Sequence, residues 1–346
     1  MSSLRYYNNE QLAKAAFSSD FDALINCLEA GFRAYGQGKV ILPEKSSQIL
    51  DDLTQSRINC MPCTVLALGY SGVKLVSVFP NNVLQGKSNV SGLILLLSAE
   101  DGSPIAVFDA GFITALRTAL VGGLAARYLA VDEPRTIGLL GAGEEAFMHM
   151  VVMAKLFPTL RECKVASRSE SSEQRFRIAA SEFVPCVGVR CCGSDYKAAS
   201  EHSDIIVTAI SGQSPILKAD WIEPGAFYCH VGGIEDEYEV ALKADKIVCD
   251  SWEDLKHRGS PTIAHMYQEG LLTDESIYAE LAELSQGAKP GRESLSEFIY
   301  FNSIGLAFTD IYVSAFLMDK CNELGLGQNL QSNTFSVFDI SQLSMA

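Results

Sequence analysis

A glycine-rich segment, Gly141-Ala142-Gly143-Glu144-Glu145-Ala146, has the spacing that most directly predicts chemistry in this sequence. The apolar run 136–140 before it favours a buried strand, and residues 146–154 after it favour a helix. A strand, the pattern G-x-G-x-x-A and a helix together form the dinucleotide-binding fingerprint. Gly141 allows the tight turn, Gly143 lets the backbone approach a pyrophosphate, and the helix N-terminus supplies amide donors. We therefore expect this segment to bind a dinucleotide cofactor.

The expected end of the second strand of that unit reads Ser167-Arg168-Ser169. An NAD-dependent enzyme usually has Asp or Glu at this point, where the carboxylate binds the ribose 2′-hydroxyl. Here no carboxylate would repel a 2′-phosphate, and the guanidinium of Arg168 could pair with it. We therefore expect these three residues to bind the cofactor and NADP(H) to be preferred, with NAD(H) as the alternative. The other interpretation of Arg168 is an ordinary surface arginine in a turn.

Lys74 lies inside the apolar segment Val73–Phe79, which is expected to form a strand. An unpaired ammonium group in an apolar core costs much free energy, so a buried lysine is either paired or functional. In a cleft it could hold a substrate carboxylate, or deliver a proton once burial lowers its pKa. We therefore name Lys74 as the candidate catalytic residue, with a water-facing edge-strand lysine as the alternative.

The chain has 346 residues and a formal net charge of −15. An acidic surface repels the nucleic-acid backbone, so we expect no nucleic-acid partner. No apolar run approaches the roughly twenty residues of a membrane span. The start, Met1-Ser2-Ser3-Leu4-Arg5, lacks a basic segment followed by an apolar one. We therefore expect a cytoplasmic protein without a membrane partner.

The ten cysteines do not have the spacing of a metal site. Only Cys60-Met61-Pro62-Cys63 has the C-x-x-C pattern, and no second pair or histidine cluster completes four ligands. The pair precedes an expected strand rather than opening a helix, which disfavours a redox role. We therefore expect no metal and reduced thiols.

The first part of the chain predicts an α+β arrangement around an antiparallel sheet. A helix is expected from Asp20 to Tyr35, with Asp20 as its cap, and another from 114 to 129. The segment Glu100–Pro104 has the composition of a hairpin turn. Strand-like segments are expected at 39–42, 63–68, 73–79, 92–97 and 105–109.

From Thr136 the pattern changes to alternating strands and helices. This alternation predicts an α/β fold with a Rossmann doubly wound parallel sheet. A last helix, 304–324, is too apolar to be a free tail, so we expect it to pack back on the first part. The strands of this second part are expected at 136–140, 163–167, 204–209, 226–231 and 246–250.

Several segments together resemble the ornithine cyclodeaminase/mu-crystallin family over nearly the whole chain. They are Val73–Pro80 with Asn82, the hairpin 102–106, Ile113-Thr114-Ala115-Leu116-Arg117-Thr118-Ala119, the Gly141 fingerprint, Val231-Gly232-Gly233, and Asn302–Ala307 with Asp310. The resemblance implies a homodimer in which a substrate-binding and dimerisation domain and a Rossmann domain enclose the active site. We expect residues 1–125, completed by 312–346, to form the first domain and residues 126–311 the second.

The resemblance also implies roles for individual residues. Arg117 would hold the substrate carboxylate near the nicotinamide, a task that suits the two parallel donors of a guanidinium; a surface salt bridge is the alternative. Lys45 stands where the family usually has arginine, so it keeps the positive charge but lacks the two parallel N–H donors of a guanidinium. An exposed loop lysine is the alternative. Positions that contact the cofactor in relatives correspond to Asn89, Arg117, Thr118, Val231 and Ser303.

The largest departure from the family follows Gly233. Ornithine cyclodeaminases have a catalytic aspartate directly after this pair of glycines, whereas this chain has Ile234, followed by Glu235-Asp236-Glu237. Isoleucine cannot act as an acid or a base, so we expect cyclodeaminase chemistry to be lost; a one-residue shift to Glu235 is the alternative. We expect the acidic run to be a solvated turn, and His230 before it to be structural.

A carbon–nitrogen double bond beside a carboxylate suits such a site, because cationic groups orient the anion for hydride transfer. A protonated imine accepts hydride with little further acid catalysis, which agrees with the missing aspartate. Similarity to bacterial pyrroline-carboxylate reductases of the family leads us to expect reduction of Δ1-pyrroline-2-carboxylate to L-proline, and of the six-membered Δ1-piperideine-2-carboxylate.

Two alternatives remain open. One is an amino-acid dehydrogenase or an amino-acid-conjugate dehydrogenase, because residues 244–252 and Lys289–Glu293 resemble the family's enzyme of siderophore-precursor synthesis. The other is a non-catalytic binding protein like mu-crystallin, which would bind a small molecule without turnover.

Overall fold

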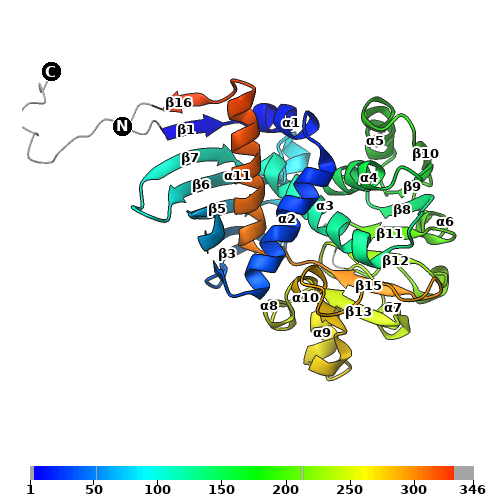
Figure 1. The fold of residues 1–346 in the computed structure, drawn as a ribbon. Coiled ribbons are helices and arrows are strands. Elements are labelled where there is room, and N and C mark those ends of the chain that lie inside the picture. Colours follow the sequence, from blue (N-terminus) through cyan, green and yellow to red (C-terminus); the bar gives the residue numbers. More distant parts are fainter. Residues whose placement is uncertain (1–3, 52, 211, 213, 331–346) are drawn as a thin grey trace, which may run out of the picture.

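The computed structural model describes residues 4–51, 53–210, 212 and 214–330, and it contains two eight-stranded sheets (Figure 1). Residues 1–3 of the expected start and residues 331–346 of the expected completion of the first domain lie outside the described residues.

The first sheet has the order β16-β1-β7-β6-β5-β4-β2, with β3 paired to β4. It is antiparallel except where β1 runs parallel to β7. Its strands are β1 (Leu4–Tyr7), β2 (Val40–Ile41), β3 (Ser46–Asp51), β4 (Ser56–Val65), β5 (Tyr70–Val78), β6 (Val90–Ser98), β7 (Pro104–Asp109) and β16 (Gln328–Leu330).

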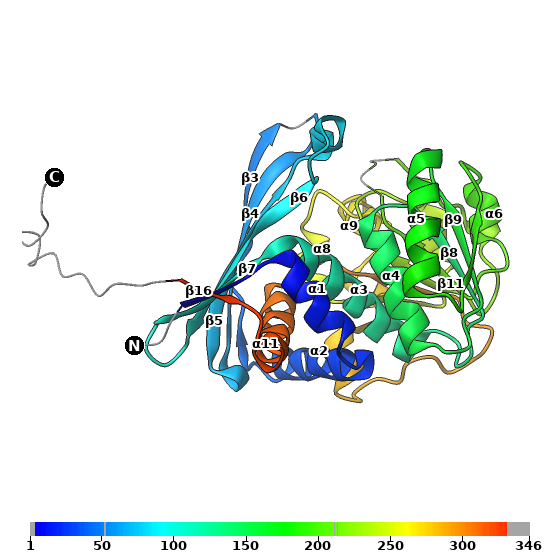
Figure 2. The ribbon, with the colours of Figure 1, turned by 90° about the horizontal axis from the view of Figure 1, so that it is seen from above.

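Within the part of the chain that the structure describes, helices cover one face of this sheet and leave the other open (Figure 2). The register aligns Met61, Lys74, Ile94 and Phe108 across β4, β5, β6 and β7 in one row, and all four are buried. Side chains alternate between the faces of a strand, so the next row faces the other way. The covering helices are α1 (Asn9–Phe17), α2 (Phe21–Gly36), α3 (Ala110–Leu129) and α11 (Ala307–Glu323).

The second sheet is parallel throughout, in the order β10-β9-β8-β11-β12-β15-β13-β14. The chain moves outward from β8 to β10 and then returns to β11 on the other side of β8, which makes the end of β8 the switch point where cofactors bind. The strands are β8 (Thr136–Leu140), β9 (Glu162–Ala166), β10 (Gly188–Cys191), β11 (Ile205–Thr208), β12 (Phe227–His230), β13 (Lys246–Cys249), β14 (Ala279–Glu280) and β15 (Ile299–Asn302).

Short helices connect these strands on both faces of the second sheet (Figure 1). They are α4 (Glu144–Leu156), α5 (Glu170–Phe183), α6 (Tyr196–Ser200), α7 (Tyr238–Lys243), α8 (Trp252–Lys256), α9 (Thr262–Gln268) and α10 (Leu281–Ser285). The 3₁₀ turns of the whole chain are η1 (Leu66–Leu68), η2 (Pro80–Gln85), η3 (Ala219–Trp221) and η4 (Asp274–Ser276).

The predicted fold class, a Rossmann doubly wound parallel sheet with an α+β part, is confirmed. Local details differ. The strand expected at 63–68 is β4, which begins at Ser56 and contains the C-x-x-C pair. The strands that were missed are β1, β3, β10, β14, β15 and β16. The expected domain boundary after residue 125 falls inside α3, which packs on α2 and α11 as well as on α4.

Candidate active site

Lys74, Arg117 and Asp310 form a buried ionic group between β5, α3 and α11. The Lys74 ammonium nitrogen lies 2.7 Å from both carboxylate oxygens of Asp310, and Arg117 Nε lies 3.2 Å from Oδ1. Lys74 is 1% exposed and Arg117 is 7% exposed. The lysine predicted to be paired or functional is therefore paired. Its partner Asp310 had no predicted role, since it lies on a helix far along the chain.

The guanidinium end of Arg117 lies against the loop that follows β15. Gly305 in this loop has a φ of +77°, and a Cβ atom there would come within 2.3 Å of Arg117 Nη1. Asp250, at the end of β13, holds the loop because its carboxylate accepts the N–H groups of Ile304 and Gly305 and the hydroxyl of Ser303. A glycine is required at position 305 both by its conformation and by the close approach of the arginine.

Lys45 joins the same cationic region from the segment just before β3. Ser46 pairs with Cys60, so the register places Lys45 on the side of Met61, in the row of Lys74. Burial, together with the nearby charges of Arg258, Arg57, Lys74 and Arg117, lowers the pKa of Lys45 to about 7. Burial, with the charge of Arg117, lowers the pKa of Lys74 to about 8 against the opposing effect of Asp310.

Arg57 and Arg258 are cations of this region that sequence reasoning missed. Arg57 lies four residues from Met61 on β4, and alternation along the strand places both on the same face. Arg258 follows α8 and donates to the carbonyl of Ile304, 3.3 Å away. Once the register was known, Arg57 could have been predicted, because it is a basic residue on the same face of the sheet as Lys74. No local sequence signal indicates Arg258.

The fingerprint segment has the shape that dinucleotide phosphates require. Gly141 has a φ of +125°, and a Cβ atom there would lie 2.5 Å from the carbonyl oxygen of Ala209, whereas Gly143 faces open space. No side chain caps the N-terminus of α4, so its amide groups remain available to an anion. Ala142 is half-buried and Glu144 is exposed. These residues fit a bound nicotinamide dinucleotide.

Glu145, in the first turn of α4, differs from its neighbours. Its Oε2 atom is buried and has no hydrogen-bond partner among the described residues. Burial raises the pKa of Glu145 to about 7, while the charges of Arg117 and Lys74 act to lower it. The fingerprint helix therefore begins close to the cationic region.

The Ser167-Arg168-Ser169 segment lies at the end of β9, on the other side of β8 from the cations. Ser169 caps α5, and the side chain of Arg168 is exposed. One carboxylate was missed: the buried Glu173 accepts the N–H of Ser167 at 2.9 Å. An extended dinucleotide would span the distance from this segment to the cations.

The other predicted cofactor residues have partners within the protein. Thr118 donates to the carbonyl of Thr114 at 2.7 Å, and Ser303 donates to Asp250 at 3.0 Å. Val231 follows β12 and is half-buried. The backbone carbonyl of Asn89, just before β6, accepts the N–H of Phe79 at 2.8 Å. Their contacts with a cofactor stay predictions.

The acidic run after Gly233 is not the solvated turn that we expected. Glu235 and Asp236 are fully buried. Glu235 accepts the hydroxyl of Thr208 at 2.6 Å and the N–H groups of Ile210 at 2.6 Å and Gly232 at 2.8 Å. The expectation is wrong for these two residues, because Glu235 accepts donors at the ends of β11 and β12 and Asp236 accepts the hydroxyl of Thr262 at 2.7 Å. Glu237 is half-buried and forms an ion pair with Lys218.

His230 belongs to the same buried network. Its Nδ1 lies 2.9 Å from Asp236 Oδ1 and 2.8 Å from the Tyr300 hydroxyl, and its Nε2 lies 2.7 Å from the Gly233 carbonyl. The acidic neighbours raise the pKa of His230 against the opposing effect of burial. Every ring nitrogen is occupied, which agrees with the structural role that we expected.

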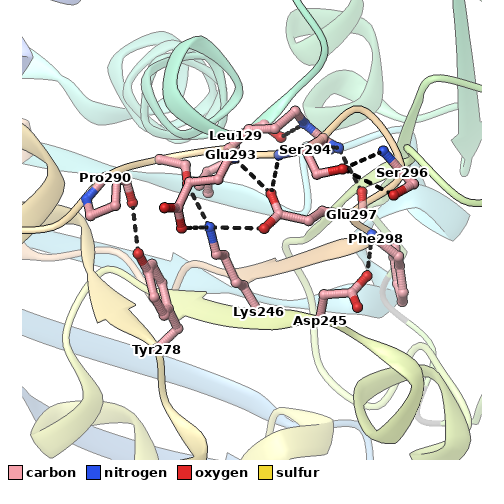
Figure 3. Close-up of polar contacts among 12 residues, drawn as sticks. Leu129, Asp245, Lys246, Tyr278, Pro290, Glu293, Ser294, Ser296, Glu297 and Phe298 are labelled. Carbon is pink, nitrogen blue, oxygen red and sulfur yellow. Dashed lines mark hydrogen bonds and ion pairs between the residues drawn. The ribbon is translucent and has the colours of Figure 1, made fainter.

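The segment Lys289–Glu293 has structural contacts as well (Figure 3). Arg292 donates to the carbonyls of Leu129 and Glu297, and Lys246 Nζ lies 2.7 Å from Glu293 and 3.0 Å from Glu297. Lys246 begins β13, whereas Asp250 and Gly305 follow the carboxyl ends of strands. These contacts therefore lie at the opposite edge of the sheet from the cations.

Two further searches of the described residues gave negative results. No group of three or more His, Cys, Asp or Glu side chains there could hold a metal ion. None of the helices in the same part of the chain combines the length and the apolar character that crossing a bilayer demands.

Comparison with known proteins identifies similar chains. The model of the ornithine cyclodeaminase/mu-crystallin family matches residues 10–324. An alanine dehydrogenase of Archaeoglobus fulgidus is 32% identical over 316 residues, which cover 90% of this chain and 94% of that protein.

Two solved structures are similar over nearly their whole length. Thermococcus litoralis Δ1-pyrroline-2-carboxylate reductase, in complex with NADH and L-proline, has a TM-score of 0.86 and 28% identity, covering 94% of this chain and 100% of that chain. An archaeal alanine dehydrogenase dimer with bound NAD has a TM-score of 0.85 and 28% identity, covering 96% of this chain and 100% of that chain.

Proposed function

The chain belongs to the ornithine cyclodeaminase/mu-crystallin family and is an NAD(P)-dependent oxidoreductase of carbon–nitrogen bonds, and we propose that it reduces cyclic ketimine acids. The proposed reactions are Δ1-pyrroline-2-carboxylate to L-proline and Δ1-piperideine-2-carboxylate to L-pipecolate. The observation that carries the proposal is the Lys74–Asp310–Arg117 group beside the N-terminus of α4. The similar reductase with bound L-proline supports the choice of substrate.

In the proposed mechanism the cations orient the substrate. The single carboxylate of Asp310 pairs with two cations, Lys74 and Arg117. The group of three therefore keeps a net positive charge that can bind a substrate carboxylate. The Nη groups of Arg117 offer it two parallel donors, and Lys45 adds charge from the segment just before β3. This arrangement fixes the imine carbon in one orientation, which lowers the entropic barrier to reaction.

When bound, NAD(P)H supplies the hydride that adds to the imine carbon. The electrons of the carbon–nitrogen double bond then move to the nitrogen, which must carry a proton. Lys74, with its pKa lowered to about 8, can give that proton and regain it from solvent. Glu145, with its pKa raised to about 7, is a second group near this site that can hold a proton.

We further propose that the cofactor is NADP(H) in preference to NAD(H). The exposed guanidinium of Arg168 and the hydroxyls of Ser167 and Ser169 would contact a 2′-phosphate. The carboxylate of Glu173 is buried and accepts an N–H group, so it does not present a free charge on the surface of the loop.

A homodimer is proposed from the uncovered face of the first sheet. Leu75 and Leu93 pair across β5 and β6 on this face, and each is 49% exposed. A second copy of the chain would cover these leucines, and the similar archaeal dehydrogenase is a dimer. Analytical ultracentrifugation should show a dimer that Leu75→Glu converts to a monomer. All ten cysteines are free, which suits the reducing cytoplasm.

The experiment for the reaction is a spectrophotometric assay of the purified protein with NADPH and Δ1-pyrroline-2-carboxylate or Δ1-piperideine-2-carboxylate. Loss of absorbance at the nicotinamide band is expected with both ketimines. An amino-acid dehydrogenase is the second candidate, because the alanine dehydrogenase is 32% identical. Oxidation of NADPH with pyruvate and ammonia, but with neither cyclic ketimine, would favour it.

A further inference from the structure

The cationic region around Lys74 contains more positive charge than one substrate carboxylate can neutralise. Lys74 and Arg117, the inner cations, share Asp310. The outer cations are Arg57 and Arg258, and no carboxylate of the described residues forms an ion pair with either of them within 4.0 Å. Asp250, a buried acid whose charge acts on Arg258, already accepts three N–H groups and a hydroxyl.

The outer cations continue outward from the inner ones. Arg57 lies four residues along β4 from Met61, the register partner of Lys74, which is a distance of about 13 Å between Cα atoms. Arg258 contacts Ile304, next to the glycine that Arg117 touches. The charges of Arg117 and Arg57 both act on Arg258, so the three guanidinium groups lie in one region. A substrate held at Arg117 would therefore extend toward Arg57 and Arg258.

Both outer arginines keep donors available for a ligand. Arg57 uses Nη1 for the carbonyl of Gln55 at 2.9 Å, and Arg258 uses Nη1 for Ile304 at 3.3 Å. Each guanidinium has five N–H donors, so most of them have no partner among the described residues. Partly buried like charges repel one another, and a bound anion would remove that repulsion.

The cofactor phosphates do not account for these arginines. The fingerprint binds phosphates at the end of β8, whereas Arg258 follows the helix after β13. β13 is four strands from β8 in the sheet, a distance of about 19 Å. The outer cations therefore face the substrate rather than the pyrophosphate.

We propose that Arg57 and Arg258 form a second carboxylate subsite, so that the preferred substrate is a ketimine dicarboxylate. This inference rests on the proposed function, since it names the substrate class of the same site. Arg117 and Lys74 bind the carboxylate beside the imine carbon, and the outer cations bind a carboxylate on the far side of the ring.

The test compares two products that differ by one carboxylate, L-proline and cis-pyrrolidine-2,5-dicarboxylate. Calorimetric titration of the full chain with saturating NADPH, and again without it, measures binding without turnover. The dicarboxylate should bind about tenfold more tightly than L-proline, because a second charge-assisted contact is made. Arg57→Gln and Arg258→Gln should each reduce this preference about fivefold and leave L-proline binding within twofold. Arg175→Gln, at an exposed position of α5, is the matched control and should change neither affinity.

Equal affinities, or a preference that both variants keep, would overturn the subsite. The assay with Δ1-pyrroline-2-carboxylate separates the two proposals. Turnover of that ketimine without any preference for the dicarboxylate removes the subsite and keeps the proposed function. Tight, arginine-dependent binding of the dicarboxylate without turnover of either ketimine keeps the subsite and removes the proposed reaction.

Discussion

Two clusters of buried charged residues in this protein differ in how completely the chain itself supplies their partners. Around His230, both carboxylate oxygens of Glu235 and Oδ1 of Asp236 are matched by hydroxyl, N–H and imidazole donors of the same chain. Around Lys74, the cations far outnumber the one carboxylate of Asp310 that pairs with them. Both clusters lie at the carboxyl ends of Rossmann strands or face them, so position alone does not distinguish them.

The difference teaches how a buried charge can be assigned a role. A charge that the chain satisfies internally stabilises the fold, because removing it leaves its donors without partners. A charge that the chain leaves unmatched costs free energy until a ligand arrives, which is typical of a binding site. The comparison therefore predicts that substitutions in the first cluster affect stability and that substitutions in the second affect ligand binding.

The largest effect is expected from Glu235→Gln. The amide would present an NH₂ group to donors that now meet a carboxylate, so the free energy of unfolding should fall by about 3 kcal/mol. Denaturant unfolding measures this change. Glu237→Gln, in the half-buried ion pair with Lys218, is the control and should change stability by less than about 1 kcal/mol. A stable variant with a raised KM for the substrate would instead place Glu235 in the binding site.

Arg117→Ala should raise the KM for the ketimine about 100-fold, because the two parallel donors to the substrate carboxylate are lost. Asp310 keeps Lys74 as its partner, so the fold should persist. Fluorescence titration should show NADPH binding unchanged. The control is Arg127→Ala on the same helix, where the arginine pairs with Asp22 on the surface. Loss of NADPH affinity equal to the loss of substrate affinity would contradict the assignment.

Lys45 makes substrate binding depend on pH. Its pKa is lowered to about 7, so the side chain is charged below that pH and loses its charge above it. The KM should therefore rise severalfold between pH 6 and pH 8, by up to about tenfold for a single titrating group. Lys45→Arg stays protonated and should flatten the profile over that range. Lys39→Arg, at an exposed position, should leave it as in the wild type.

The smallest effect is expected at the exposed cation of the cofactor segment. Arg168→Gln should raise the KM for NADPH about fivefold and leave the KM for NADH unchanged, because only NADPH carries the 2′-phosphate. Initial rates with each nucleotide measure the two values. A variant that weakens both nucleotides equally would contradict a contact with the 2′-phosphate.

Local patterns were sufficient for much of the fold. The fingerprint, the helix capped by Asp20 and the alternation after Thr136 each depend on neighbouring residues, and the structure has them. The position of β15 between β12 and β13 depends on pairing between distant segments, which no local period specifies.

The site was predictable to a similar degree. An ammonium in an apolar strand indicated that Lys74 is buried, but its pairing with Asp310 joins β5 to the last helix. The acidic run Glu235-Asp236-Glu237 was predicted to be solvated because three adjacent carboxylates usually face water. Only the folded loops show that backbone N–H groups surround Glu235. Arg258 gave no signal, since its position depends on where the helix after β13 ends.

The most direct test of the central claim is the initial rate of NADPH oxidation with Δ1-pyrroline-2-carboxylate, measured for the wild type and for Arg117→Ala side by side. The account predicts steady oxidation by the wild type and, for the variant, a rate that recovers only at far higher ketimine concentrations. Absence of oxidation with either cyclic ketimine, or equal KM values for the two proteins, would contradict it.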